Sequence, residues 1–188
     1  MLASLDADTL VRPDYFLALH RHFPQTRAGA AVIPFCHQPA DTAEGQAAID
    51  RYELYLHHYA LGLELAGSPY AFWTIGSALS FRAEAYARMG GMNRRQAGED
   101  FYFLQQMAKT VGVARLQGTE VYPSPRLSDR TPFGTGPTVG RLLAGEREAV
   151  RFYHPECFRL LARWLVLADG ASVRPAAEVL AQARRLSN

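Results

Sequence analysis

Lysine is nearly absent from this sequence, because Lys109 is the only one and every other strongly basic side chain is arginine. Arginine keeps its charge and binds phosphate groups through paired hydrogen bonds, so phosphate-binding side chains are well supplied. The 20 basic and 18 acidic residues nearly balance, and the formal net charge is only +2. This balance argues against the strongly basic surface that nucleic-acid binding requires. We therefore expect no nucleic-acid partner.

Cysteine is also scarce, since Cys36 and Cys157 are the only two and lie far apart in the chain. Neither a disulfide framework nor the close spacing of a zinc site is indicated, and a reduced, cytoplasmic compartment fits best. A chain of 188 residues buries enough surface to fold without such crosslinks.

Long apolar runs are missing as well. The best candidate for a membrane span, residues 158–168, is too short and is interrupted by Arg159 and Arg163. No basic segment typical of a signal peptide follows Met1. The sequence predicts a protein without a transmembrane segment, and it leaves open a peripheral association with the inner face of the membrane.

Strand-like and helix-like segments alternate along the chain. The segments that predict strands are residues 1–5, 28–35, 71–81 and 111–121, and the first of them is expected to be buried. A helix is predicted to open at residues 12–14, and further helices are predicted at 47–66, 82–89, 98–110 and beyond 142, the last part with a break near residue 170. This alternation is typical of an α/β layered fold. We expect one domain over residues 1–140 and a helical extension over residues 141–188.

The first chemical motif is Asp6-Ala7-Asp8, which directly follows the first predicted strand. Side chains two residues apart on a strand point to the same side, so the two carboxylates would repel each other. A hard divalent cation removes this repulsion and can bridge two phosphates. The alternative is an ordinary turn in which Asp8 or Thr9 caps the following helix.

Two further motifs follow in order. Gly76 and Ser77 interrupt an apolar stretch, where a glycine indicates either a close approach by a ligand or a strand bulge. Glu99 and Asp100 then open a predicted helix after Gly98. A carboxylate at that position either stabilises the helix N-terminus or, if it faces a cleft, serves as a general base.

The ordered set of an acidic pair, a Gly-Ser strand, a Gly90-Gly91 helix end and a Glu-Asp helix start resembles the family 2 glycosyltransferases. The resemblance implies a partial GT-A-like three-layer α/β fold with a mixed sheet. It also implies inverting transfer from a nucleoside-diphosphate sugar to a saccharide or lipid-linked acceptor, with Mn²⁺ or Mg²⁺ as cofactor. Asp6 and Asp8 would meet the metal and the diphosphate, and Asp100 would be the base supported by Glu99. The residues implied to line the acceptor pocket are Trp73, Thr74, Gly76 and Ser77.

A loop is predicted over residues 122–140, after the implied base, and it contains Arg126, Arg130, Gly134 and Gly136. In this fold such loops often close over the donor, so the arginines would neutralise the diphosphate and the glycines would act as hinges. A mobile, solvated connector is the alternative. His154 follows, at a place where some related enzymes have a third metal ligand, although an ordinary surface histidine is the simpler interpretation.

Family members carry several βα units before the acidic pair, whereas Met1 here lies within the strand that leads to Asp6. We expect those units to be encoded upstream or supplied by a partner chain, and the activity of this chain alone stays open. Two other functions are considered. One is a sugar-nucleotidyltransferase, and the other is a non-catalytic module that associates with another chain or a second copy through an exposed sheet edge.

Overall fold

The computed structural model describes residues 1–92, 98–128, 132–171 and 174–186 of the chain. The chain forms two compact units, each with its own packing. The first unit comprises Met1–Leu56 and Trp73–Arg151, and the second comprises His57–Phe72 and Phe152–Asn188. The domain boundary predicted at residue 140 stays a prediction, and the two units are described separately below.

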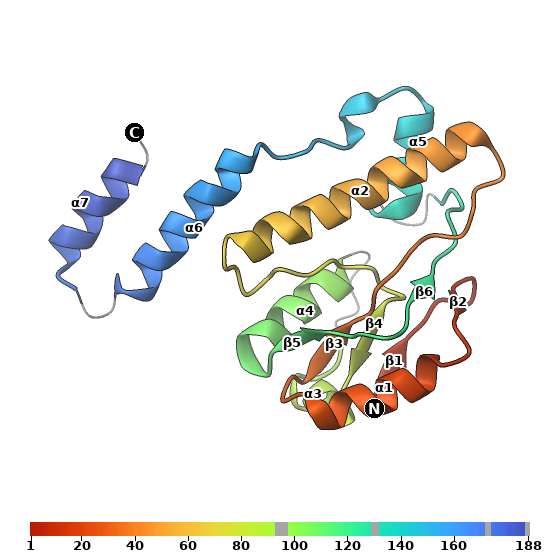
Figure 1. Cartoon of the computed structure of the whole chain (residues 1–188), viewed down its shortest axis with the longest axis horizontal. Coiled ribbons are helices and arrows are strands. Elements are labelled where there is room, and N and C mark those ends of the chain that lie inside the picture. Colours follow the sequence, from red (N-terminus) through yellow and green to blue (C-terminus); the bar gives the residue numbers. More distant parts are fainter. Residues whose placement is uncertain (93–97, 129–131, 172–173, 187–188) are drawn as a thin grey trace. The chain divides into compact units, whose positions relative to one another are not determined.

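The first unit is built on a four-stranded mixed sheet (Figure 1). Its strands, in spatial order, are β1 (Leu2–Ser4), β4 (Leu79–Phe81), β3 (Ala30–Val32) and β5 (Val113–Arg115). β4 is antiparallel to both of its neighbours, whereas β3 and β5 are parallel. β1, β3 and β5 therefore run in one direction and end at the same edge of the sheet. The predicted α/β fold with a mixed sheet is confirmed.

A second, smaller ribbon lies beyond that edge. β2 (Leu10–Val11) pairs with β6 (Val121–Tyr122) in an antiparallel manner. Phe35, which follows β3, forms a parallel bridge with Val121 on the other side of β6. Segments from three distant parts of the sequence thus meet next to Asp6-Ala7-Asp8.

Most helices of the first unit lie between strands, as the sequence predicts, and the last one follows β6. They are α1 (Tyr15–Gln25), the first part of α2 (Ala43–Leu65), α3 (Ala83–Arg88), α4 (Glu99–Thr110) and α5 (Thr135–Leu143), with a short 3-10 turn at Arg147–Ala149. α1 buries Tyr15, Leu19 and Phe23, whose spacing of four residues places them on one helical face.

The central strands carry the core of the first unit. Every residue of β3 and β4 is buried. Phe81 of β4 packs edge-to-face against Phe103 of α4, with ring centroids 5.1 Å apart. A second buried cluster joins α2 to α5 through Ile49, Tyr52 and Val139. These contacts fix the starts of α4 and α5, which matter for the site below.

The second unit contains the end of α2 together with α6 (Pro155–Asp169) and α7 (Ala176–Leu186). Phe158 of α6 packs against α2 at Gly62, where no side chain intervenes. The predicted C-terminal helices, with a break near residue 170, are confirmed. In the described ranges, no helix combines the length and the apolar character that a membrane span needs.

Two predicted strands differ from the structure. Of residues 71–81, only Leu79–Phe81 form a strand, and the chain before them turns at Ile75, whose carbonyl accepts a hydrogen bond from Ala78 N at 2.9 Å. The apolar residues there are buried as an irregular segment, which the apolar pattern alone does not distinguish from a strand. The predicted strand 111–121 is likewise divided into β5 and β6.

The prediction that the first strand is buried is also wrong. β1 lies at the edge of the sheet, and Leu2 is 41% exposed. The predicted loop 122–140 ends earlier than expected, because α5 begins at Thr135 and includes Gly136. The positive φ of 104° at Gly134 allows the sharp entry into this helix.

Candidate active site

The edge where β1, β3 and β5 end gathers most of the predicted site. Asp6 follows β1, and α4 opens with Glu99 and Asp100 after Gly98, whose φ of 76° is in the left-handed region. α4 packs on β3 and β5 and leads directly into β5. Its first turn therefore lies near the end of β5 rather than near its start. Ligand sites of α/β sheets commonly lie at this edge.

Gly76 and Asp100 are direct neighbours. A Cβ atom built on Gly76 would lie 3.5 Å from Asp100 Oδ2. The glycine therefore leaves this oxygen without a side chain against it on that side. The predicted acceptor residue and the predicted base, 24 positions apart in the sequence, are thus brought together.

Asp100 has the electrostatics of a proton acceptor. Burial raises the pKa of Asp100, and repulsion from Glu99 and from Asp6 adds to this effect. Two backbone hydrogen bonds oppose this effect, one that Phe101 N donates to Asp100 Oδ1 at 2.7 Å and one from the backbone N–H of Asp100 itself. A carboxylate with a raised pKa is a stronger base near neutral pH. The interaction with Asp6 also places the first residue of the acidic pair and the predicted base in one electrostatic environment.

The acidic pair lies in a turn and not on an extended strand. Thr9 N donates a hydrogen bond to the Asp6 carbonyl at 3.1 Å, which closes the turn over residues 6–9. The prediction that the two carboxylates point to the same side because they lie on a strand is therefore wrong. The alternative helix-cap role for Asp8 or Thr9 is wrong too, because α1 begins at Tyr15, after Asp14.

Asp8 forms an ion pair with Arg126. The Arg126 Nε donates to Asp8 Oδ2, and both side chains are partly exposed. Arg126 lies four residues beyond β6, which pairs with β2 just after the turn. Two of the residues predicted to meet the diphosphate are thereby brought together. Arg130, the other predicted arginine, lies outside the described residues.

Tyr52 and Thr135 are functional candidates that the sequence did not reveal. Burial raises the pKa of Tyr52 to about 12, and its side chain is hydrogen-bonded to Thr135 and interacts electrostatically with Asp100. This contact ties α2 to the start of α5 beside the predicted base. The sequence pattern of a long helix does not distinguish Tyr52 from an ordinary core residue.

The remaining predicted acceptor residues are largely packed into the first unit. The Trp73 indole Nε1 donates to the Ile33 carbonyl at 2.9 Å, and the Arg115 guanidinium lies 4.9 Å from its ring centroid. Ser77 is buried, whereas Thr74 is partly exposed. The structure gives Trp73 a packing role, and its predicted contact with an acceptor stays a prediction.

Gly136 allows a close backbone contact, and its predicted role as a hinge stays a prediction. It lies inside α5, where an added Cβ would stand 2.6 Å from the Ser128 carbonyl oxygen and 2.7 Å from Ser128 N. The glycine therefore lets the loop backbone pack closely on the helix. Gly134, immediately before α5, keeps the conformation that only glycine adopts easily.

The predicted metal ligands Asp6 and Asp8 carry suitable oxygen atoms, but the described residues do not form a complete metal site. Across residues 1–92, 98–128, 132–171 and 174–186, no group of three or more His, Cys, Asp or Glu side chains converges. Asp8 does hold a cation, the Arg126 guanidinium. Mg²⁺ is often bound by one or two carboxylates together with substrate phosphates, so Asp6 and Asp8 fit such an ion. His154 belongs to the second unit, where its Nδ1 accepts from Glu156 N at 3.2 Å, and its predicted role as a ligand stays a prediction.

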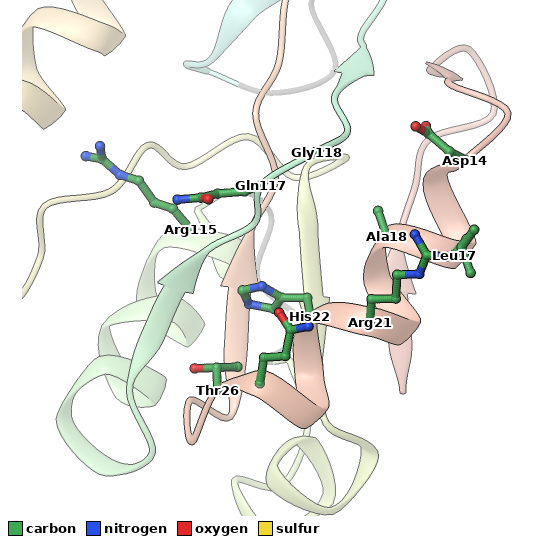
Figure 2. A pocket seen from close by; sticks show the side chains of 10 residues that line it. Asp14, Leu17, Ala18, Arg21, His22, Thr26, Arg115, Gln117 and Gly118 are labelled. Atoms are coloured by element: carbon green, nitrogen blue, oxygen red, sulfur yellow. The ribbon is translucent and has the colours of Figure 1, made fainter.

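A cavity of about 430 Å³ lies elsewhere in the first unit, between α1 and the segment after β5 (Figure 2). His22 is directed from α1 toward that segment, whereas the Arg115 guanidinium points away from it. The polar residues of its wall are Asp14, Arg21, His22, Gln25, Thr26, Arg115 and Gln117. Every residue of the predicted site is absent from this wall, so the cavity is separate from the acidic pair and Asp100.

The fold and the site together define a mixed α/β domain with carboxylates at the end of its parallel strands. Residues 2–136 match the family model described as "Glycosyl transferase family group 2". Because this match covers more than half of the sequence, the chain belongs to that family. Comparison with curated proteins and with solved structures gave no match. Membership implies a nucleotide-sugar donor and an acceptor, and the family often uses divalent metals.

Proposed function

We propose that the chain carries out metal-dependent, inverting transfer of a sugar from a nucleoside-diphosphate sugar to a hydroxyl of a saccharide or lipid-linked acceptor. The observation that carries this proposal is the position of Asp100 Oδ2 against Gly76, in the electrostatic environment of Asp6. Base, acceptor side and acidic pair are then parts of one site.

The donor side of the proposal rests on Asp6, Asp8 and Arg126. The two carboxylates would hold Mn²⁺ or Mg²⁺, which supplies positive charge for the leaving diphosphate. Arg126 already lies beside Asp8 and can pair with a phosphate through its guanidinium. The protein thus offers both anionic groups for a metal and a cationic group for the diphosphate within one turn and its neighbouring segment.

The acceptor side of the proposal rests on Asp100 and Gly76. Asp100 accepts the proton of the acceptor hydroxyl while that oxygen forms a bond to the anomeric carbon. The bond from the anomeric carbon to the diphosphate breaks on the opposite face, so the configuration is inverted. Glu99 raises the basicity of Asp100 through its negative charge, and Gly76 leaves room for the hydroxyl.

The donor half is tested by thermal unfolding of the intact protein with Mn²⁺ and a nucleoside diphosphate. We expect the ligands to raise the melting temperature and Asp8→Ala to abolish the rise, because binding to the folded state alone stabilises it. Asp41→Ala, at an exposed position, is the matched control and should keep the rise. Absence of any rise in the wild-type protein with all common nucleoside diphosphates would refute donor binding.

A second candidate function, association through a sheet edge, is favoured by β1. This strand is paired by β4 on one side, and Leu2 and Leu5 are each 41% exposed. An open edge of this kind can pair with a second copy or with another chain. Light scattering of the intact protein tests this: Ala3→Pro should reduce an oligomer to monomers, and a wild-type monomer at all concentrations would exclude self-association.

A further inference from the structure

Gln38 links the acidic turn to the segment that carries Arg126. Its side-chain Nε2 donates to the Asp8 carbonyl at 2.8 Å and to the Tyr122 carbonyl at 2.7 Å. Its backbone N donates to the Pro123 carbonyl at 2.9 Å. Both hydrogens of the amide are therefore used, and they join three segments that are distant in the sequence.

Besides Gln38, the described residues support the acidic turn through few contacts, one of which is the partly exposed ion pair of Asp8 with Arg126. Its own closure is the bond from Thr9 N to the Asp6 carbonyl, and the ribbon that follows it, β2 with β6, has only two residue pairs. Short two-stranded ribbons are marginally stable by themselves. A side chain that bonds both the turn and β6 therefore has a large influence on where the Asp8 carboxylate lies.

The position of Gln38 is itself well fixed. Cys36 N donates to the Val121 carbonyl at 3.1 Å, and Val121 N donates to the Pro34 carbonyl at 2.9 Å. His37, the preceding residue, is buried, and its Nδ1 lies 2.6 Å from Glu53 Oε1 of α2. Gln38 thus extends from a segment anchored to both β6 and α2, which gives the amide a rigid base.

We propose that Gln38 is a positioning residue that holds Asp8 and Arg126 in the relative arrangement needed to bind a metal-diphosphate. The identity of the ligand in this inference rests on the proposed function. The positioning of Asp8 and Tyr122 by Gln38 does not, because it follows from the hydrogen bonds themselves. The amide fixes the Asp8 backbone and leaves the Asp8 carboxylate free to face Arg126 or a cation. The same amide fixes Tyr122, four residues before Arg126, so both partners share one reference point.

The test compares Gln38→Met with Gln46→Met in the intact protein. Methionine has a similar length and carries no hydrogen-bond donor or charge. Gln46 is a matched control, because it also bonds the loop, accepting from Ala40 N at 2.9 Å, yet it does not bond Asp8. We expect Gln38→Met to raise the Kd for Mn²⁺ with a nucleoside diphosphate by roughly tenfold, and Gln46→Met to leave it within about twofold.

A second readout separates positioning from general loosening. Gln38→Met should raise the KM for the donor and leave the KM for the acceptor unchanged, whereas a loosened fold would alter both. A third readout needs no ligand: hydrogen exchange at the Thr9 and Leu10 amides should accelerate in Gln38→Met and not in Gln46→Met. If Gln38→Met does not fold, Gln38→Asn, which keeps the amide but shortens its reach, takes its place in all three measurements.

The outcomes distinguish this inference from the proposed function. If the wild-type protein binds the metal-diphosphate and Gln38→Met binds it equally well, Gln38 is not a positioning residue. If the wild-type protein binds no nucleoside diphosphate, the proposed function fails, and hydrogen exchange then decides alone about Gln38. Unchanged exchange at Thr9 and Leu10 overturns the inference in either case.

Discussion

The Arg126 Nε donates to Asp8 Oδ2, and this ion pair joins residues that are 118 positions apart in the sequence. In the proposed reaction each partner has another role, since Asp8 meets a metal and Arg126 meets the diphosphate. A single contact therefore connects the two halves of donor binding. In that reaction a metal would compete with Arg126 for the Asp8 carboxylate until the diphosphate binds the guanidinium.

We predict that Arg126→Ala has opposite effects on two affinities. Mn²⁺ alone should bind a few-fold more tightly, because Asp8 has lost its cationic partner, whereas a nucleoside diphosphate with Mn²⁺ should bind about tenfold more weakly. Stability should change little, because exposed ion pairs contribute about 0–1 kcal/mol. Calorimetric titration measures both affinities.

Arg141→Ala is the control for Arg126→Ala, because Arg141 forms a comparably exposed ion pair with Glu146. Neither affinity should change in this variant. If Arg126→Ala weakens binding of Mn²⁺ alone, Arg126 does not compete for Asp8 and the exchange of partners is wrong.

Asp100→Asn should remove transfer and preserve donor binding. Asparagine has nearly the same shape but does not accept the acceptor's proton, and loss of a general base commonly lowers the rate by about 10²–10⁴-fold. Steady-state rates and the Kd of the nucleoside diphosphate measure the two effects in the intact protein. Glu99→Gln should cause a smaller loss, since Glu99 acts on Asp100 only through its charge. Normal turnover of Asp100→Asn would assign the base to another residue.

The same substitution should stabilise the fold. Burial raises the pKa of Asp100 above its ordinary value of 3.8, so the folded state binds this proton more tightly than the unfolded state. The corresponding stability is fully present below the ordinary pKa and is lost as the pH rises through the raised value. At neutral pH the ionised carboxylate is therefore a cost that Asp100→Asn removes.

Melting curves in metal-free buffer check this stability effect. A change of 1 kcal/mol shifts the melting temperature by roughly 2–4 °C in a protein of this size. Asp100→Asn should melt above the wild-type protein at pH 7, and the difference should shrink toward pH 4. Asp41→Asn, at an exposed position, should show no such difference. A lower melting temperature for Asp100→Asn at pH 7 would contradict the unfavourable environment of its carboxylate.

The parts of the site that could be predicted are those with a local cause. The start of α4 is marked in the sequence by Gly98, followed by Glu99 and Asp100. The structure places Gly98 at a positive φ and the two acidic residues in the first turn. The order of the acidic pair, Gly76 and Asp100 along the chain likewise indicates one site. Such local signals depend on backbone conformation and helix ends, which neighbouring residues largely determine.

The parts that could not be predicted depend on contacts between distant segments. Nothing near Gln38 indicates that its amide bonds Asp8 and Tyr122, because that contact requires β2, β6 and the segment after β3 to meet. At Trp73 the sequence pattern predicts a regular element that the structure does not form. Its apolar surroundings suggested a strand, whereas the indole bonds the Ile33 carbonyl and buries an irregular segment instead.

His22 should make the fold sensitive to mild acid. Burial lowers the pKa of His22 below its ordinary value of 6.5, and the positive charge of Arg82 lowers it further. The Nε2 atom is buried and has no hydrogen-bond partner in the part of the chain that the structure describes. Protonation therefore favours the unfolded state, so this stability is complete above pH 6.5 and is lost as the pH falls through the lowered pKa.

The measurement is the free energy of unfolding by urea at several values between pH 7.5 and pH 5. One titrating group changes this free energy by at most about 1.4 kcal/mol per pH unit. His22→Gln should flatten the profile in this range, whatever its effect on stability at pH 7.5. His20→Gln, only two residues away on the exposed side of α1, should leave the slope unchanged. Equal slopes for His22→Gln and the wild-type protein would show that His22 takes up its proton in the folded state as readily as in the unfolded chain.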